Sequence, residues 1–118
     1  MEGFATKYRG SLYGYTGGQA EMMYTPNGKA VTKVSVAVGG GEGRKPRWIQ
    51  MIFWEKAAEV ANQVLDKKGM AVIVEGRPDA SAYKSRKGEL KSQMILTVDR
   101  LWIVEEGDKQ VEVDLEGK

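Results

Sequence analysis

Two tryptophans, Trp48 and Trp54, stand six residues apart in one strand-like run of large apolar residues. Side chains alternate across a strand, so Trp48 and Trp54 project from one face, while Ile49, Met51 and Phe53 share the other. The three apolar residues suit a hydrophobic core. Large aromatics on a more polar face can stack against nucleobases. The alternative is a strand that is buried on both faces, as in parallel sheets and sandwiches.

Three cations, Arg44, Lys45 and Arg47, come just before the first tryptophan and could contact phosphates. They follow the glycine-rich segment 39–43, which invites comparison with a nucleotide-binding loop. The phosphate loop requires Gly, four residues and then Gly-Lys-Ser/Thr, and this segment does not have that spacing. Pro46 also leads into a strand rather than a helix. We therefore interpret the segment as a flexible connection between strands.

A second cluster combines one aromatic with three cations at a predicted turn, in Tyr83-Lys84-Ser85-Arg86-Lys87. Lys87-Gly88 is the turn signal between the last two predicted strands. A charged hairpin tip is common on ordinary protein surfaces, so the lysines alone decide little. Tyr83 at the base of the turn favours a binding element.

The composition argues against most kinds of enzyme, because the chain contains neither cysteine nor histidine. Thiol nucleophiles, the usual zinc sites and imidazole acid–base catalysis are therefore excluded. An enzyme would have to use carboxylates, lysine or hydroxyls. The sequence predicts a binding protein rather than an enzyme, with no metal and no cofactor.

Charge is distributed unevenly along these 118 residues, whose net charge is +2. Residues 1–104 hold sixteen Lys and Arg against ten Asp and Glu, whereas residues 105–118 hold two against six. The basic part predicts a polyanionic partner, although a solvated surface would also carry this charge. There is no membrane-spanning run and no secretory leader, which predicts an intracellular protein with no membrane partner.

Period-two patterning dominates and predicts a sheet protein with one helix, in which Gly69 ends the helix. Pro26-Asn27-Gly28 indicates a hairpin turn. The order of three strands, one helix and two strands predicts an all-β fold, a five-stranded Greek-key OB-fold barrel with one helix between strands 3 and 4. A generic α+β sheet would also fit. The expected strands are 7–15, 30–38, 48–54, 70–75 and 94–104, and the expected helix is 55–68.

The domain prediction is one OB-fold domain over residues 1–104, followed by a short acidic C-terminal tail over 105–118. We expect this tail to be mostly disordered. Val111, Val113 and Leu115 alternate, so a short terminal strand is the alternative.

Three stretches of the sequence together resemble the bacterial-type single-stranded DNA-binding protein family. Residues 21–38, with Glu21, Tyr24 and the Pro-Asn-Gly turn, are similar to its first hairpin and second strand. Residues 54–69, beginning Trp-Glu-Lys-Ala-Ala-Glu-Val, are similar to its third strand and helix. Residues 72–83, with Val-Ile-Val-Glu-Gly-Arg and then Tyr83, are similar to its fourth strand and binding hairpin.

The resemblance implies an OB-fold that stacks bases of single-stranded DNA on aromatic side chains. Trp48, Trp54 and Tyr83 match three stacking positions of the family. A further aromatic in the loop after the second strand has no counterpart, because the glycine-rich segment 39–43 occupies that loop. For the DNA backbone we predict contacts from seven cations: Arg9, Lys33, Arg44, Arg47, Lys84, Arg86 and Lys87.

The predicted function is single-stranded DNA binding without strong sequence preference, protecting exposed strands in replication, recombination and repair. The resemblance also implies a homo-oligomer, with a tetramer favoured over a dimer, as well as replication or repair proteins as partners. It implies a cytoplasmic, nucleoid-associated location if the source is bacterial. Three alternatives stay open: a primosomal replication-restart accessory protein, an RNA-binding OB domain, and an interaction module that binds no nucleic acid.

Overall fold

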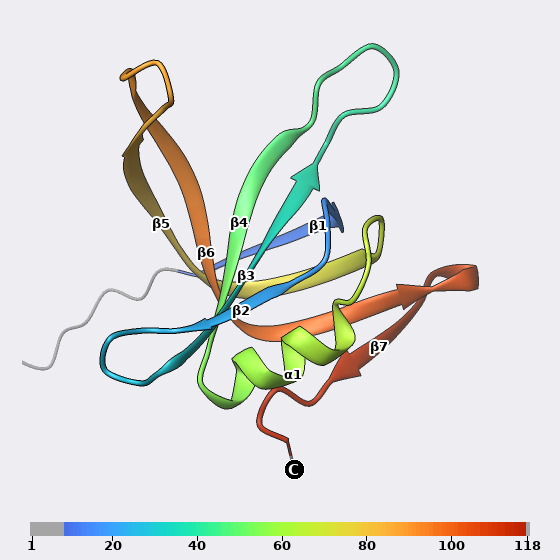
Figure 1. Cartoon of the computed structure of the whole chain (residues 1–118). Helices are drawn as coiled ribbons and strands as arrows, with labels where there is room; N and C mark the ends of the chain where they lie inside the picture. Colours follow the sequence, from blue (N-terminus) through green and yellow to red (C-terminus); the bar gives the residue numbers. More distant parts are fainter. Residues whose placement is uncertain (1–8, 118) are drawn as a thin grey trace, which may run out of the picture.

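The structure, a computed structural model, describes residues 9–117 as a strand-rich barrel with one α-helix (Figure 1). The predicted strand at residues 7–15 begins at Gly10, and Lys7 and Tyr8 lie outside the described residues. The elements in chain order are β1 (Gly10–Thr16), β2 (Glu21–Tyr24), β3 (Ala30–Val38), β4 (Arg47–Trp54), α1 (Lys56–Val64), β5 (Ala71–Lys84), β6 (Leu90–Glu105), the 3-10 turn η1 (Glu106–Asp108) and β7 (Lys109–Val113).

Five of the strands close into a ring in the order β1-β5-β6-β4-β3, and β3 pairs back with β1. The closing pairs are Tyr15 with Ala37 and Thr16 with Val36. All ladders of the ring are antiparallel except that between β4 and β6. A closed sheet leaves few free strand edges. The prediction of a five-stranded OB-fold barrel is confirmed, with β2 added beside β3 and β7 beside β6.

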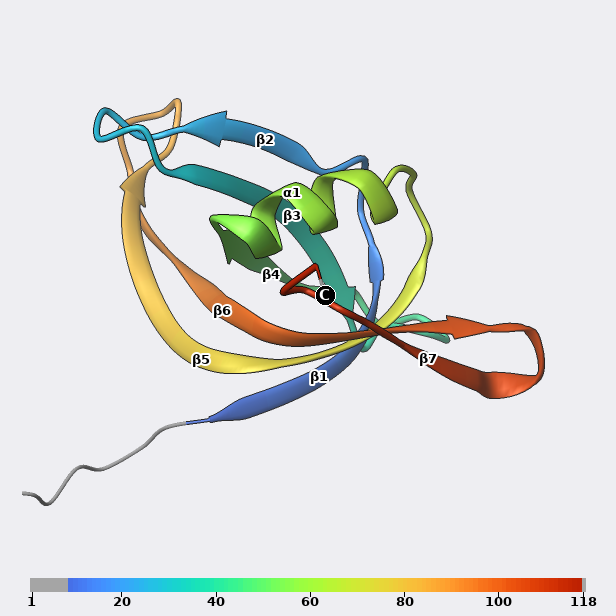
Figure 2. The same ribbon diagram turned by 90° about the horizontal axis from the view of Figure 1, so that it is seen from below.

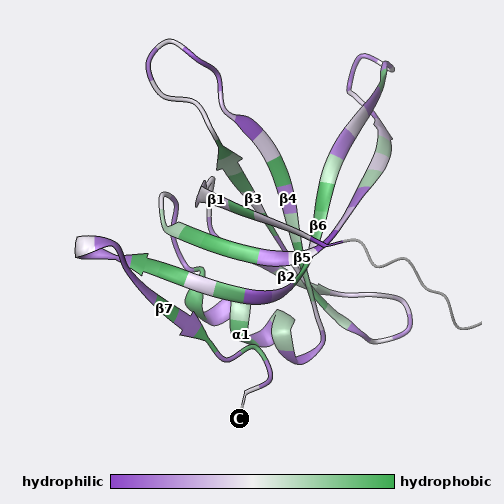
Figure 3. Cartoon of the chain, turned by 180° about the vertical axis from the view of Figure 1, so that it is seen from behind, coloured by the Kyte–Doolittle hydropathy of each residue, from purple (hydrophilic) through white to green (hydrophobic). Residues whose placement is uncertain are grey.

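Alternation along each strand places the core inside the ring, as β4 shows. Met51 and Phe53 are fully buried, and they pack with Val36 of β3 and Val74 of β5. Figure 3 shows bands of hydrophobic and hydrophilic residues along β4 and β6. Burial of apolar surface is the main favourable term in folding, so this inner face stabilises the barrel while the outer face stays free to bind.

Helix α1 lies across one end of the barrel (Figure 2). Ala58 and Ala61 are fully buried, as the helical spacing predicts. The helix ends at Val64 rather than Lys68. Leu65 turns into the core, and its carbonyl accepts a hydrogen bond from the amide of Ala20. Over residues 9–117 no helix has the length and apolarity needed to cross a membrane.

Strands β5 and β6 are much longer than predicted and form an arm that projects beyond the barrel. The sequence predicts strands ending at Glu75 and beginning at Met94, whereas pairing continues to Lys84 and Leu90. The register shifts between Glu75 and Gly76, where a β-bulge bends the hairpin away from the ring. Figure 1 shows that this arm and the β3–β4 connection project from the same end of the barrel, away from α1.

The C-terminal segment up to Gly117 forms a strand and a turn. The sequence instead predicts a mostly disordered tail over residues 105–118. β7 pairs antiparallel with β6, from Leu101 opposite Val113 to Glu105 opposite Lys109. Leu115 is only 7% exposed and belongs to the core cluster. The alternation at Val111, Val113 and Leu115 was the correct signal, because pairing and burial outweigh the acidic charge of the segment.

Candidate nucleic-acid interface

Trp48 and Trp54 lie on the outer surface of β4, and they are 52% and 41% exposed. The alternative of a second buried face is therefore wrong. Because Trp54 lies six positions after Trp48 along the strand, the backbones at the two residues are about 20 Å apart. Between them lies Gln50, which is paired with Ser35 of β3. We call the outer surface that carries Trp48, Trp54 and Tyr83 the aromatic face.

Tyr83 reaches this face from the projecting β5–β6 arm and is 47% exposed. An open groove of about 420 Å³ lies between the start of β4 and this arm. Arg47, Trp48, Tyr83 and Met94 all line it. The fold thus brings Tyr83 close to Arg47 and Trp48, although Tyr83 lies 35 positions after Trp48 in the sequence.

A second hollow, of about 270 Å³, adjoins the stretch of β4 between the two tryptophans. Lys33, Ser35 and Gln50 line it, together with Glu21 of β2. Lys33 is paired with Ile52 on one side and with Glu21 on the other. A cation, neutral polar groups and the Glu21 side chain therefore line the hollow between the two stacking positions.

The remaining predicted cations lie at the ends of the two projecting segments. Lys84, Arg86 and Lys87 are exposed around the tip of the β5–β6 hairpin, where the amide of Gly88 donates to the carbonyl of Ser85 at 2.9 Å. Arg44 is exposed in the β3–β4 connection. Among residues 9–117, no ion pair involves any of these four cations, nor Lys33 or Arg47. Their charge is available to an external anion.

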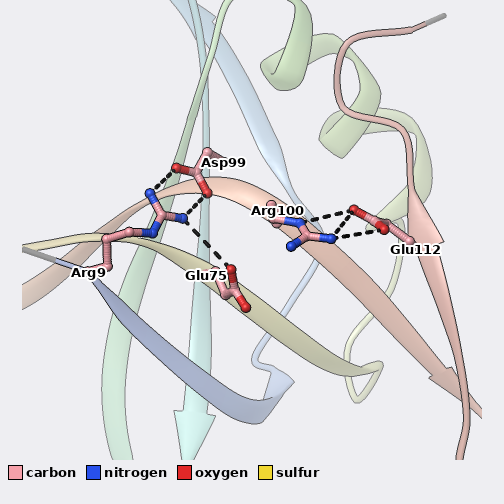
Figure 4. A network of polar contacts seen from close by, with 5 residues as sticks. All are labelled: Arg9, Glu75, Asp99, Arg100 and Glu112. Atoms are coloured by element: carbon pink, nitrogen blue, oxygen red, sulfur yellow. Dashed lines mark hydrogen bonds and ion pairs between the residues drawn. The ribbon is translucent and has the colours of Figure 1, made fainter.

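Arg9 differs from the other predicted cations, because its guanidinium is held by carboxylates of the same chain (Figure 4). It donates two hydrogen bonds of 2.7 Å to Asp99 and lies 3.8 Å from Glu75. The hydrogen bonds from Arg9 lower the pKa of the Asp99 carboxyl and raise the pKa of Arg9 itself. The structure therefore does not bring Arg9 to the aromatic face as a free charge.

Sequence reasoning missed two further cations, Arg77 and Lys91. Lys91 is paired directly with Tyr83, and Arg77 lies on β5 at the alternation that Tyr83 occupies. Both side chains are exposed. Alternation counted back from Tyr83 would have found Arg77, but the predicted strand ended at Glu75. Aromatic rings flanked by exposed cations on one open surface suit a flexible polyanion with flat, stackable groups.

Comparison with known proteins identifies one family. The family described as "Single-strand binding protein family" matches residues 8–104. Several proteins named single-stranded DNA-binding protein are similar in sequence to this chain. The protein of this name from Wolinella succinogenes is 27% identical over 92 residues, which cover 72% of this chain and 56% of the relative. That of Neisseria meningitidis serogroup A is 36% identical over 84 residues, covering 65% and 48%. That of Helicobacter hepaticus is 26% identical over 92 residues, covering 72% and 54%. The chain spans about half the length of these curated relatives.

Proposed function

Because this chain belongs to the single-strand binding protein family, we propose that it binds single-stranded DNA without strong sequence preference. It would protect exposed strands during replication, recombination and repair. The observation that carries the proposal is the aromatic face itself. Trp48, Trp54 and Tyr83 are each about half exposed on one outer surface. Beside them lie cations that form no ion pair within residues 9–117.

In the proposed mechanism, aromatic rings bind the bases and cations bind the phosphates. Bases stack on Trp48, Trp54 and Tyr83, and every base has a ring face, so stacking tolerates any sequence. Cations of the two projecting segments and of β3 neutralise the phosphates, in the set Lys33, Arg44, Arg47, Arg77, Lys84, Arg86, Lys87 and Lys91. Arg9 contributes least, because an incoming phosphate would compete with Asp99 and Glu75 for its guanidinium.

A fluorescence titration with oligo-dT tests this function directly. Base stacking on Trp48 and Trp54 should strongly quench tryptophan emission and saturate at a defined ratio of nucleotide to protein. Unchanged emission, with no binding in a mobility assay, would contradict the proposal. Competition by the matching ribo-oligonucleotide measures preference for DNA over RNA, and equal competition would favour an RNA-binding OB domain.

We further propose that the protein assembles into a homo-oligomer, most simply a tetramer, with a dimer as the alternative. Residues Gly10 to Gly14 of β1 pair with β5 on one side, while the ladder with β3 involves only Tyr15 and Thr16. The exposed Tyr13 and Tyr15 lie on the same strand. A strand with one unpaired edge and exposed rings is a natural surface for a second copy.

Light scattering at micromolar concentration decides the assembly. A mass several times that of one 13.0 kDa chain supports it, and a mass near that of one chain would rule it out. If the source is bacterial, the proposed role places the protein in the cytoplasm on the nucleoid, where replication and repair proteins are candidate partners.

A further inference from the structure

Gly17, in the connection between β1 and β2, lies directly against the indole of Trp48. A β-carbon placed on Gly17 would overlap Cζ3 of Trp48 and come within 2.9 Å of its Cη2 atom. The next residue, Gly18, has open space around the same position, with nothing within 4 Å. Neither glycine has a left-handed φ. Position 17 therefore needs glycine because the Trp48 ring leaves no room for a side chain there, and not because the backbone has a conformation that only glycine adopts.

The backbone at Gly17 is held in place and has little freedom to move away from the ring. The amide of Gly17 donates to the carbonyl of Ser35 at 2.8 Å, and the amide of Thr16 donates to the carbonyl of Met70 at 2.9 Å. The Thr16 hydroxyl also donates to the carbonyl of Lys67 at 2.8 Å. Thr16 itself is buried. A larger residue at 17 would therefore displace the Trp48 ring rather than the strand.

We propose that Gly17 is a positioning residue for DNA binding, which holds the Trp48 indole in one orientation over the groove that Arg47 and Tyr83 also line. The inference rests on the proposed function. Part of the indole lies against the backbone, and the rest of the half-exposed ring remains open to the groove. A ring fixed before binding loses less rotational freedom when a base stacks on it, so preorganisation strengthens binding.

The first test removes the other two emitters, with Trp54→Phe and Trp102→Phe, so that only Trp48 fluoresces. In this chain, without DNA, Gly17→Ala should shift the emission and raise quenching by acrylamide, because the ring is lifted from the backbone. Gly18→Ala is the matched control and should leave the Trp48 emission as it was. Unchanged emission after Gly17→Ala would overturn the proposal, whether or not the protein binds DNA.

The second test is a double-mutant cycle on oligo-dT affinity, with Trp48 kept or replaced by Phe. With Trp48 present, Gly17→Ala should weaken binding by about tenfold, within the effect of losing one stacked base. Phenylalanine lacks the second ring of the indole, to which the Cζ3 and Cη2 atoms that contact Gly17 belong. In the Trp48→Phe protein, Gly17→Ala should therefore change affinity by no more than about twofold.

An equal loss in both backgrounds would assign Gly17 a purely structural role and sink the inference. The variant that carries both Gly17→Ala and Trp48→Phe also controls for a folding defect, because it has the same alanine without the full indole ring beside it. If the parent protein itself binds no DNA, the proposed function fails, while the DNA-free emission comparison still decides how the ring is held.

Discussion

Two outer surfaces of the barrel carry similar residue types and differ in how their charges are used. The aromatic face has half-exposed Trp48, Trp54 and Tyr83 beside cations that have no carboxylate partner among residues 9–117. The other surface, formed by β1 with the barrel ends of β5, β6 and β7, also has aromatics, and we call it the paired face. On the paired face, Arg9 is bound by Asp99, and Arg100 by Glu112 at 3.2 Å.

The two faces differ in whether their arginines are neutralised by carboxylates of the same chain, and not in the types of residue that they carry. The guanidinium of Arg100 lies 4.7 Å from the ring centroid of Trp102, so an aromatic and an arginine are combined here too. β7 supplies the Glu112 that satisfies this arginine, and it comes from the acidic C-terminal part of the chain. An incoming phosphate would have to displace these carboxylates, whereas on the aromatic face it displaces only water and counterions. We therefore expect changes on the paired face to alter stability, and changes on the aromatic face to alter DNA affinity.

The largest expected effect is on stability, from Leu115→Ala behind the paired face. Leu115 is buried in the core cluster beyond β7, and large-to-small core substitutions of this type cost about 2–5 kcal/mol of unfolding free energy. Urea denaturation measures the loss. Val111→Ala, on the 39% exposed Val111 of β7, is the control and should cost much less. A stability equal to that of the parent would mean that the C-terminal segment is not part of the folded core.

On the aromatic face, Trp48→Ala should weaken oligo-dT binding by about 1–3 kcal/mol, a range established for single-strand-binding OB-folds themselves. Trp54→Ala should behave in the same way. Both side chains are about half exposed, so we expect a smaller loss in the free energy of unfolding than for Leu115→Ala. Equilibrium titrations of both variants, with urea denaturation alongside, separate affinity from stability.

Trp102→Phe supplies the contrast from the paired face. It removes the larger ring beneath Arg100 and should lower the melting temperature while leaving oligo-dT affinity close to that of the parent. A loss of affinity as large as that of Trp48→Ala would show that the paired face also binds DNA, and the distinction between the two faces would fail.

A smaller effect is expected from the charges at the hairpin tip. Binding to single strands releases counterions, so log affinity falls with log salt by roughly 0.7 per phosphate neutralised. Replacing Lys84, Arg86 and Lys87 together by alanine should make that slope shallower by about 2. Arg100→Ala with Lys109→Ala removes two cations from the region of β6 and β7, and the slope should then stay near that of the parent. A parent slope near zero would contradict backbone neutralisation altogether.

Local patterns in the sequence predict much of this arrangement. Alternation around Trp48 and Trp54 separates the core residues Met51 and Phe53 from the outer rings, and the helical spacing of Ala58 and Ala61 locates α1. These features depend on neighbours within a few residues. The sequence pattern underestimates the extent of the β5–β6 arm. No residue of its outer half, 79–84 and 90–95, is buried, so its strand pairing is not encoded in apolar periodicity.

Features that depend on distant partners could not be predicted in the same way. The sequence marks Arg9 as a free cation, and only the fold brings Asp99 to it across 90 positions. The β-bulge contributes directly, since Glu75 pairs with Arg100 and Gly76 with Val98, which leaves Asp99 as the extra residue that projects outward. Likewise, the role of Gly17 appears only in the fold, where β3 pairs with both β1 and β4 and so brings the Trp48 ring against Gly17.

The smallest expected effect comes from Asp99→Asn, which tests whether the paired face is neutralised as described. Arg9 lowers the pKa of Asp99 chiefly by its hydrogen bonds, so the folded protein favours the charged carboxylate. This contribution is present above the ordinary carboxyl pKa of 3.8 and is lost as the pH falls through the lowered value. Asp99→Asn should therefore lower the melting temperature slightly at neutral pH, and the difference from the parent should shrink under acid conditions. Both groups are well exposed, so solvent screens the pair and the effect stays small.

Melting curves across that pH range check the prediction, and added salt should reduce the neutral-pH difference as well. A difference that grows on acidification would show that Asp99 is not held as a carboxylate by Arg9. An oligo-dT affinity that rises markedly in Asp99→Asn would show that the released Arg9 binds phosphate, and would extend the DNA-binding surface to the paired face.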